Sequence, residues 1–380
     1  MNNDVRKICF VTGTRADYGI MSRLMSNLHQ DPAVELQIVA TNMHLSPLHG
    51  MTVGEIESDG LPVDYRVPMN RPDDSPRSIV SSMGDEMKGM AQAFDRLKPD
   101  LIVILGDRYE MLVAASAALL FHIPVAHLYG GEVTQGAIDD AIRNAITMLS
   151  TYHFTSTALY RDRLISMGID SEHVFHIGAL GADNISRITP MPLSELEKSI
   201  EFQLGEEYLL VTFHPVTLEP GEAVGQTRRL LKALEKFIDR YKILITMPNS
   251  DSEGDAIASE ILIWAETHPK HVKTVVSLGR ERYYAALAHA SAVVGNSSSG
   301  LTEAPSFGIP TVNIGNRQKG RAFGSTVIHC PTETPAIIEA IDKALTTDFK
   351  KSCAQNPDNP YSFPGTLTRL HTLLTTLPLH

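Results

Sequence analysis

The chain has 380 residues, 43% hydrophobic and 20% charged, and its three cysteines form no CxxC pair. This length exceeds one ordinary domain and is sufficient for two, each with its own hydrophobic core. The formal net charge of −11 excludes a general affinity for nucleic acid, so any anion site must be built locally. The separated cysteines exclude a disulfide framework or zinc knuckle, and they fit a reducing compartment, so we expect a cytoplasmic protein.

Apolar, β-rich segments alternate with helix-like segments in the first half of the chain. A strand is predicted at residues 7–13 and a helix near residues 19–29, and further strands are expected at ELQIVATNMH, DLIVILG, IPVAHLYGG, YHFTST and VFHIGALG. Such uninterrupted apolar runs are typical of parallel strands covered on both faces. The longest apolar run, residues 111–129, contains His122 and Pro124. These residues favour a buried helix and strand over a membrane span.

A polar, proline-containing connection at residues 186–208 precedes a second alternating series. Strands are predicted there at YLLVTFHP, KILITMPNS, TVVSLG, SAVVGNSSS, TVNIG and STVIHC. Alternating strands and helices predict doubly wound α/β sheets. We therefore expect two Rossmann-like domains, residues 1–188 and 189–365, with a cleft between them, and a last helix at residues 366–380.

Polar side chains follow the predicted strands, at the edge where open α/β sheets bind ligands. They are Thr14, Arg15, Asp17 and Tyr18 after the first strand, Asp107 and Arg108 after DLIVILG, Glu132 and Thr134 after IPVAHLYGG, His214 after YLLVTF, Asn249 and Asp251 after KILITMP, and the serines after SAVVGN. Strand ends are often polar, so the whole set carries the argument and no single member does.

The segment at residues 295–321, GNSSSGLTEAPSFGIPTVNIGNRQKGR, has the composition of a nucleoside diphosphate site. Its phosphate donors are the backbone N–H groups of a helix predicted to start at LTEAPSFG, the hydroxyls of Ser297 and Ser298, and the cations Arg317 and Arg321. Glu303 suits a sugar diol, as the acid of the Rossmann motif suits ribose. The alternative is a serine-rich helix cap beside a solvated basic loop.

The N-terminal loop GTRADYG lacks the glycine patterns of dinucleotide-binding and Walker loops, which disfavours NAD and P-loop ATP binding. Its Arg15 is predicted either to reach a diphosphate or to cap a neighbouring helix. His214, ahead of Pro215, is either a core histidine or an acid, base or diphosphate donor.

Carboxylates gather in the first half of the chain. Asp107 and Glu132 end strands that we expect to be adjacent, and Asp139 and Asp140 stand one turn before Arg143 on a helix. Two carboxylates near one cleft can have their pKa values pushed apart and divide acid and base roles. Helix capping for the first two, and a surface ion-pair cluster for the other three, are the alternatives.

Six motifs occur in order along the chain: TGTRADYG, LGDRYE, YGGEVTQGAIDDAIRNAIT, FHPVT, GNSSSGLTEAPSFG and NIGNRQKGR. Together they resemble the hydrolysing UDP-N-acetylglucosamine 2-epimerases of bacterial sialic-acid-type and legionaminic-acid-type pathways. The resemblance covers nearly the whole chain, and the combination is specific although each motif alone is not. It implies a GT-B arrangement with the active site in the inter-domain cleft, a C-terminal helix that packs back on the first domain, and a homodimer or tetramer.

The resemblance also implies roles for individual residues. It assigns catalysis to Asp107, Glu132, Asp139, Asp140 and His214, and UDP or substrate contacts to Arg15, Gly19, Arg108, Arg143, His214, Asn249, Ser297, Ser298, Glu303, Arg317 and Arg321. Neither a cofactor nor a metal ion is expected, and neither nucleic acid nor a membrane is expected as a partner. Many relatives have Arg-His where this chain has Arg143-Asn144, which puts a role for the second residue in doubt.

The implied reaction converts UDP-N-acetylglucosamine and water into N-acetylmannosamine and UDP. UDP leaves C1, a carboxylate removes the C2 proton to give 2-acetamidoglucal, and water adds back with protonation of C2 from the other side. Which carboxylate performs which step stays open. The alternatives are the same reaction on UDP-2,4-diacetamido-2,4,6-trideoxyglucose, a non-hydrolysing epimerase, a GT-B glycosyltransferase, and a nucleotide-sugar binding protein without activity.

Overall fold

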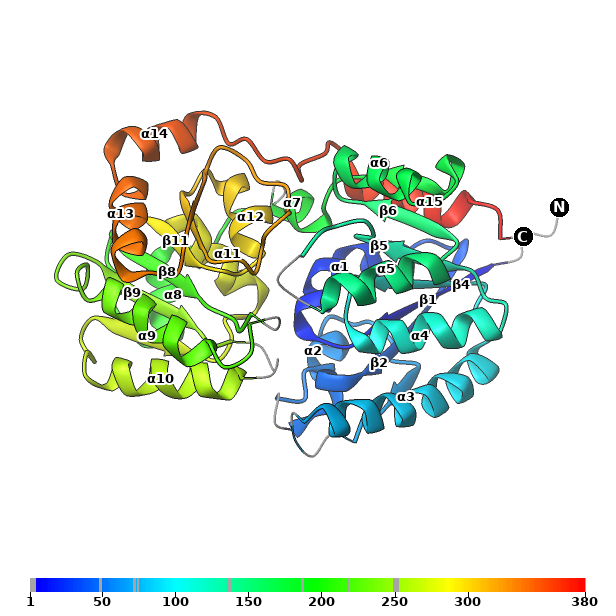
Figure 1. Ribbon diagram of the computed structural model, residues 1–380. Helices are drawn as coiled ribbons and strands as arrows, with labels where there is room; N and C mark the ends of the chain where they lie inside the picture. The colour runs from blue at the N-terminus through cyan, green and yellow to red at the C-terminus, as the bar shows by residue number, and fades with distance from the viewer. Residues whose placement is uncertain are drawn as a thin grey trace. The chain divides into compact units, whose positions relative to one another are not determined.

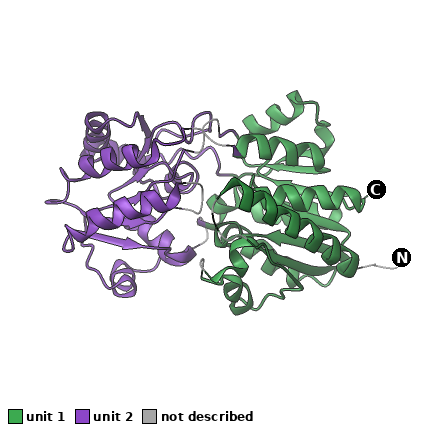
Figure 2. Cartoon of the chain, turned by 60° about the horizontal axis from the view of Figure 1, so that its bottom comes forward, with its two compact units in different colours: residues 1–132, 139–184, 363–380 green, residues 133–138, 185–362 purple. Residues whose placement is uncertain are grey.

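The computed structural model describes residues 5–47, 50–70, 73, 75–134, 138–185, 188–216, 219–248 and 253–379. Contacts divide the chain into two compact units (Figures 1 and 2). Unit 1 comprises residues 1–132, 139–184 and 363–380, and unit 2 comprises residues 133–138 and 185–362. Each unit contains one parallel sheet with helices, so the predicted α/β class with two doubly wound sheets is confirmed.

The sheet of unit 1 has seven parallel strands in the order β3-β2-β1-β4-β5-β6-β7. They are β1 (Arg6–Thr12), β2 (Val34–Thr41), β3 (Tyr65–Val67), β4 (Leu101–Leu105), β5 (Val125–Leu128), β6 (Tyr152–Thr155) and β7 (Val174–His176). The strand order reverses direction between β1 and β4. The carboxyl ends of these two strands therefore form the switch point at which such sheets bind ligands.

Helices cover both faces of this sheet. They are α1 (Arg15–His29), α2 (Val53–Ser58), α3 (Pro76–Leu97), α4 (Tyr109–Leu120), α5 (Asp139–Leu149), α6 (Ala158–Ser166), α7 (Leu180–Ile185) and α15 (Thr366–Thr376), with short 3₁₀ turns at Asn42–Leu45 and Ser171–His173. In β1, Ile8 and Phe10 pack in a core with α1 and α15, whereas Cys9 and Val11 pack in a core with α3 and α4. Both faces of the strand are thus buried, which explains its uninterrupted apolar sequence.

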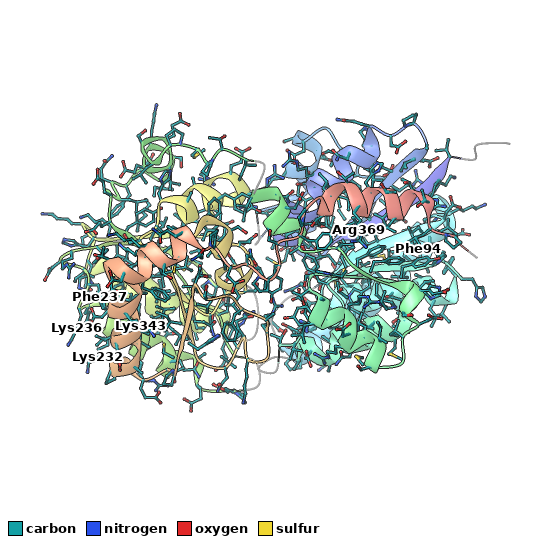
Figure 3. The ribbon with its side chains drawn as sticks, turned by 90° about the horizontal axis from the view of Figure 1, so that it is seen from above. Phe94, Lys232, Lys236, Phe237, Lys343 and Arg369 are labelled. Atoms are coloured by element: carbon teal, nitrogen blue, oxygen red, sulfur yellow. The ribbon has the colours of Figure 1, made fainter. Side chains whose placement is uncertain are left out.

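Helix α15 returns from the end of unit 2 to complete unit 1. Its Leu367, Leu370 and Leu374 are buried in the core that contains Phe10. Arg6 donates to the carbonyl of Leu374 at 2.8 Å, tying the helix to β1. Figure 3 labels Arg369 on this helix, and its guanidinium carbon lies 5.2 Å from the ring centroid of Phe363.

The sheet of unit 2 has six parallel strands in the order β10-β9-β8-β11-β12-β13. They are β8 (Tyr208–Thr212), β9 (Lys242–Thr246), β10 (Val272–Val275), β11 (Ala292–Gly295), β12 (Thr311–Ile314) and β13 (Val327–Cys330). The order reverses between β8 and β11, which places the switch point of this unit there.

The helices of unit 2 are α8 (Leu193–Ile200), α9 (Ala223–Leu234), α10 (Gly254–Glu266), α11 (Gly279–His289), α12 (Ser299–Thr302), α13 (Thr334–Ala344) and α14 (Thr347–Gln355), with a 3₁₀ turn at Ala304–Phe307. Leu209 and Val211 of β8 pack with α9, α10 and α13, while Tyr208 and Leu210 pack with α8 and α11. Figure 3 shows Lys232 of α9 near Lys343 of α13, as expected for two helices that share one core.

Two helix starts differ from the prediction. Helix α1 begins at Arg15, before the predicted start near Gly19, because Thr14 and Asp17 form a reciprocal capping box. Helix α12 begins at Ser299, before the predicted start at Leu301, and has only four residues. The apolar run at residues 111–129 forms most of α4 and the whole of β5. Among the described residues, no helix is long and apolar enough to cross a membrane.

Candidate active site

The turn after β4 carries Asp107 and Arg108 at the switch point of unit 1. Gly106 adopts a φ of 85°, a left-handed conformation that favours glycine, and its N–H donates to the carbonyl of Leu128 on β5. Arg108 is the N-cap residue of α4, and its Nε donates to Glu110 at 2.7 Å. The guanidinium carbon of Arg108 lies 5.5 Å from the ring centroid of Tyr109.

Arg143 of α5 gathers three of the predicted acidic residues. Its side chain is 1% exposed and forms ion pairs with Asp107 and, at 3.0 Å, with Asp140. The same guanidinium donates to the backbone carbonyl of Glu132 at 2.7 Å. The cluster is therefore enclosed rather than a surface ion-pair group. Its carboxylates remain accessible, because Asp107 and Asp140 are 22% and 24% exposed.

Two further contacts fix this acidic cluster. The carboxylate of Glu132 is buried and accepts a hydrogen bond from Ser156, just beyond β6, at 2.6 Å. Arg163 of α6 approaches Asp140 at 3.7 Å. Asp139 is the first residue of α5, where a carboxylate interacts favourably with the helix dipole. The predicted residues Asp107, Glu132 and Asp140 are thus brought together around one arginine.

His127 of β5 lies beneath this cluster and was not predicted as a functional residue. Its Nε2 is 2.7 Å from the carbonyl of Gly106, and its Nδ1 is 3.4 Å from the hydroxyl of Thr147 on α5. Burial lowers the pKa of His127 to about 4. The neutral ring therefore donates from Nε2 to Gly106, which connects β5 to the Asp107 turn and to α5. A histidine inside an apolar strand run was the signal in the sequence.

The β1–α1 turn holds Arg15 and Gly19. The carboxylate of buried Asp17 accepts from the backbone N–H groups of Gly13 and Thr14, each at 3.0 Å. Arg15 forms an ion pair with Glu55 of α2. A Cβ added at Gly19 would meet no atom within 4 Å, so the fold itself leaves space at that position.

In unit 2, Asn296 joins the ends of the two central strands. It is fully buried, its Oδ1 accepts from the backbone N–H of His214 at 2.7 Å, and its Nδ2 donates to the carbonyl of His214 at 2.8 Å. The preceding Gly295 has a φ of 141°, and a Cβ there would lie 1.9 Å from the carbonyl oxygen of Thr212. Only glycine fits this close approach, and Asn296 then fixes the backbone that carries His214.

The loop after β12 contacts the same turn. Arg317 donates to the carbonyl of Asn296 at 3.3 Å, and Gln318 donates to the same oxygen at 2.9 Å. Arg317 and Arg321 both lie in the loop that follows β12, and β12 is paired with β11. The structure brings Arg317 to the backbone of Asn296, the residue directly before Ser297 and Ser298.

The serine turn itself differs from the predicted anion site. Because α12 has only four residues, it offers a much smaller dipole than the longer helix that we expected. Any phosphate contact there would rest on the hydroxyls and individual N–H groups of the turn. Glu303 caps the end of α12, and burial raises the pKa of its carboxyl group. The hydroxyl of Tyr284 donates to Glu303 at 3.5 Å.

Two predicted strand-end residues, Asn249 and Asp251, lie outside the described residues.

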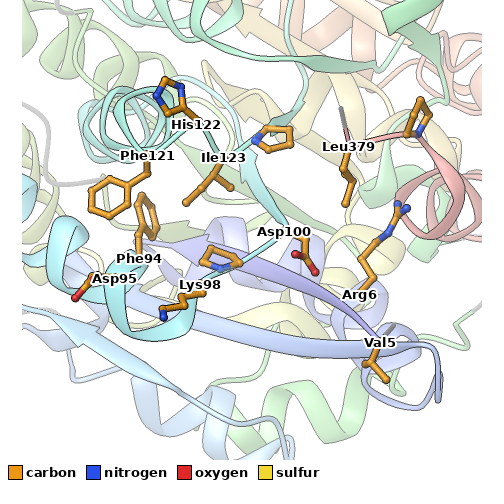
Figure 4. Close-up of a pocket in the computed structure, with 13 residues that line it drawn as sticks. Val5, Arg6, Phe94, Asp95, Lys98, Asp100, Phe121, His122, Ile123 and Leu379 are labelled. Atoms are coloured by element: carbon orange, nitrogen blue, oxygen red, sulfur yellow. The ribbon is translucent and has the colours of Figure 1, made fainter. Parts of the chain in front are cut away.

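A hollow of about 710 Å³ occurs at the amino ends of β1, β4 and β5, with Arg6, Phe94, Lys98 and Phe121 among its lining (Figure 4). Its lining includes none of the predicted site residues, so it is separate from them. Among the described residues, no group of three or more His, Cys, Asp or Glu side chains is arranged to hold a metal ion.

Comparison with known proteins identifies the family. A family model described as UDP-N-acetylglucosamine 2-epimerase matches residues 26–375. The GDP/UDP-N,N'-diacetylbacillosamine 2-epimerase (hydrolyzing) of Campylobacter jejuni is 38% identical, over 91% of this chain and 89% of the relative. The UDP-N,N'-diacetylbacillosamine 2-epimerase (hydrolyzing) of Legionella pneumophila is 36% identical, over 99% of this chain and 97% of the relative.

A solved structure shares the fold. UDP-GlcNAc 2-epimerase from Neisseria meningitidis, bound to UDP-GlcNAc, matches with a TM-score of 0.81 at 18% identity, over 97% of this chain and 100% of that chain. The family predicted from the six motifs is therefore confirmed. The chain belongs to the UDP-N-acetylglucosamine 2-epimerase family and is an enzyme of its hydrolysing branch.

Proposed function

We propose that the enzyme hydrolyses a UDP-activated 2-acetamido sugar and inverts the configuration at C2. The C1–O bond breaks, and its electron pair leaves with the diphosphate of UDP. A base removes the C2 proton, which forms the C1=C2 double bond. Water then returns a hydroxyl group to C1 and a proton to the opposite face of C2, so that one water molecule is consumed.

The observation that carries this proposal is the cluster of carboxylates around buried Arg143. The reaction needs one group that removes a proton from C2 and one that returns a proton on the other face. Asp107 and Glu132 supply carboxylates just beyond neighbouring strands, and Asp140 supplies one from the first turn of α5; Asp107 and Asp140 are partly exposed. Fixed acid and base groups of this kind typically contribute 10²–10⁴-fold to a rate. Arg143 would hold them in position, with Asp139 as a further member.

Departure of the diphosphate needs positive charge and hydrogen-bond donors. We assign this role in unit 1 to Arg15 and Arg108, with Gly19 allowing close approach. In unit 2 we assign UDP binding to His214, Asn249, Ser297, Ser298, Glu303, Arg317 and Arg321. A single well-placed donor to such a developing charge is worth ~3 kcal/mol.

We further propose UDP-N,N'-diacetylbacillosamine, which is UDP-2,4-diacetamido-2,4,6-trideoxyglucose, as the substrate. The names of the two relatives at 36–38% identity support it. The second candidate is UDP-N-acetylglucosamine, which the family description names and which would give N-acetylmannosamine for sialic-acid-type sugars. The motifs do not separate the two sugars. The two sugars differ only at C4 and C6, beyond the reacting carbons.

The test is NMR of the purified protein with each UDP-sugar in D2O. We expect free UDP in the phosphorus spectrum and a manno-configured sugar that carries deuterium at C2. The sugar with the higher kcat/KM is the substrate. A UDP-linked manno sugar would instead identify a non-hydrolysing epimerase, and binding of both sugars without turnover would contradict the proposed activity.

The role of Glu132 gives a specific prediction. Replacing Glu132 by Gln keeps the size of the side chain and its contact with Ser156 but removes the charge. We expect unchanged UDP affinity in titration calorimetry and a fall in kcat of about 100-fold or more. Unchanged turnover would remove Glu132 from the mechanism.

A further inference from the structure

Two carboxyl groups lie wholly buried beside the switch point of unit 1, and the proposed chemistry uses neither. Glu86 of α3 and Glu110 of α4 are both 0% exposed. Oε1 of Glu110 accepts the hydrogen bond from Nε of Arg108 at 2.7 Å. Within the described part of the chain, Oε2 of Glu110 has no hydrogen-bond partner, and the Glu86 carboxyl group faces the hydroxyl of Thr41. Such burial is costly for a carboxylate unless an opposite charge compensates it.

The two carboxyl groups differ in their surroundings, because only Glu110 contacts a cation. Burial and the neighbouring charge of Glu110 raise the pKa of Glu86 to about 10. Glu86 is therefore protonated at neutral pH. The cation that contacts Glu110 is Arg108, whose side chain is 23% exposed.

Glu110 also contacts the other arginine-bearing turn. A Cβ added to Gly13 would lie 2.7 Å from Oε1 of Glu110 and 2.9 Å from its Cγ. The backbone at the end of β1 therefore packs directly on this carboxyl group, two residues before Arg15. One buried side chain thus touches both the β1–α1 turn and the β4–α4 turn.

The geometry of Arg108 follows from these contacts. Glu110 holds the guanidinium by Nε, the nitrogen nearest the main chain, and the ring of Tyr109 lies 5.5 Å from its central carbon. A guanidinium fixed in this way loses less conformational freedom when it binds an anion than a freely rotating one.

We propose that Glu110 is a positioning residue for the diphosphate: it orients Arg108 for this anion and joins the Arg108 turn to the turn of Arg15. The inference rests on the proposed role of Arg108 in binding UDP. Glu110 itself touches no substrate atom in this scheme. Glu86 is the neutral neighbour that fills the remaining buried space.

A double-mutant cycle on the full-length enzyme tests the proposal. Binding of UDP is measured by calorimetry and binding of uridine, which lacks the diphosphate, by ligand-observed NMR. We expect Glu110→Gln to weaken UDP binding about tenfold, the lower end of what losing an orienting partner costs at metal sites. Uridine binding should not change. In an Arg108→Ala background, Glu110→Gln should cause no further loss.

Glu86→Gln is the matched control, because it replaces a protonated buried carboxyl group in the same place by a neutral group of equal size. Its UDP affinity should stay within about twofold of the parent, whereas Glu110→Asp, which keeps the charge, should recover part of the affinity lost in Glu110→Gln. If Glu110→Gln does not fold, Glu110→Asp and Gly13→Ala carry the test. The added methyl group would displace the Glu110 carboxyl and should weaken UDP binding but not uridine binding.

The outcomes separate two kinds of failure. Equal weakening of UDP and uridine, or a loss that adds fully to that of Arg108→Ala, would overturn the positioning role. If Arg108→Ala weakens UDP binding but no change at Glu110 does, the inference fails and the proposed function stands. If Arg108→Ala leaves UDP affinity unchanged, the proposed role of Arg108 fails, and the inference fails with it.

Discussion

At the scale of single residues, Arg143 shows how one buried cation organises several acids. Its guanidinium is 1% exposed, while its partners Asp107 and Asp140 lie partly at the surface. The permanent charge of an arginine cannot be relieved by loss of a proton. The buried guanidinium therefore needs the two carboxylates to balance its charge, and removal of Arg143 would leave Asp107 and Asp140 without their common partner.

This arrangement predicts a large cost for Arg143→Met. Breaking a buried ion pair by removing one partner typically costs ~3 kcal/mol or more. We expect a loss of about that size in urea unfolding followed by circular dichroism, together with loss of activity. Arg161→Met is the control, because its pair with Asp162 is exposed and should be worth less than about 1 kcal/mol. Equal stability of the two variants would show that the cluster does not support the fold.

The candidate acids could be predicted from the sequence, whereas the residues that position the site could not. Asp107 and Glu132 could be predicted because parallel strands bring their carboxyl ends to one edge of a sheet, and Asp140 because it precedes Arg143 by one helical turn. Glu110 and Asn296 could not, because each acts through contacts between segments distant in sequence. Glu110 meets Gly13, and Asn296 meets the backbone of His214, and neither pairing has a local pattern.

At the scale of secondary-structure elements, His127 connects three parts of the acidic site. It lies on β5, faces the carbonyl of Gly106 after β4, and contacts Thr147 of α5. A second buried histidine, His153, lies on the adjacent strand β6, and burial lowers its pKa to about 3. Both rings are neutral in the folded protein at neutral pH.

These histidines predict a loss of stability in mild acid. The pKa of His127 is about 4 in the folded protein and 6.5 when unfolded. Below pH 6.5 the unfolded chain therefore binds a proton that the folded protein does not, and stability falls with pH until about pH 4. At pH 5 the loss from His127 is about 2 kcal/mol.

The comparison of His127→Gln with the parent at pH 7 and pH 5 measures this contribution. Glutamine keeps an N–H donor but does not titrate, so the variant should lose about 2 kcal/mol less between the two pH values. Glu86, whose raised pKa acts in the opposite direction, contributes equally to both proteins and cancels. An identical pH dependence of unfolding in the two proteins would be evidence against a neutral, buried His127.

Most elements were predictable from apolar runs, and the errors have local causes. Residues 111–129 form α4 and β5 because His122 and Pro124 break the run. The early start of α1 had a signal in the sequence, the Thr14–Asp17 capping box. The end of α12 at Thr302 had a weaker one, since Pro305 follows within three residues and disfavours a continuing helix. The predicted domain boundaries remain a prediction.

At the scale of the whole molecule, the chain passes into unit 2 at the end of α7 and returns to unit 1 at residue 363, just before α15. Three leucines of this helix are buried in the core that covers β1. Thr366 additionally donates to the carbonyl of Ile177 at 2.6 Å. The sheet of unit 1 is therefore covered on one face by a segment more than 350 residues distant from its first strand.

Truncation after Ser362 should destabilise unit 1 and leave the sheet of unit 2 intact. Full burial of each leucine contributes ~1.5–3 kcal/mol, so the loss should be of the order of 5 kcal/mol. We expect a lower thermal unfolding midpoint in calorimetry. A chain that ends at Pro378 is the control, because it keeps α15 and the contact of Tyr152 with the Pro378 carbonyl. Equal midpoints for the two truncated proteins would contradict a structural role of α15.

The return of α15 also sets the order in which the nascent protein can mature on the ribosome. The strands β1 to β7 emerge first, yet the part of their hydrophobic face that α15 covers stays open while all of unit 2 is translated. At 5–20 residues per second, synthesis of residues 185–365 takes roughly 10–40 seconds. During that interval the nascent first half exposes the apolar surface that Leu367, Leu370 and Leu374 later bury. Chaperones bind exposed apolar surface of this kind.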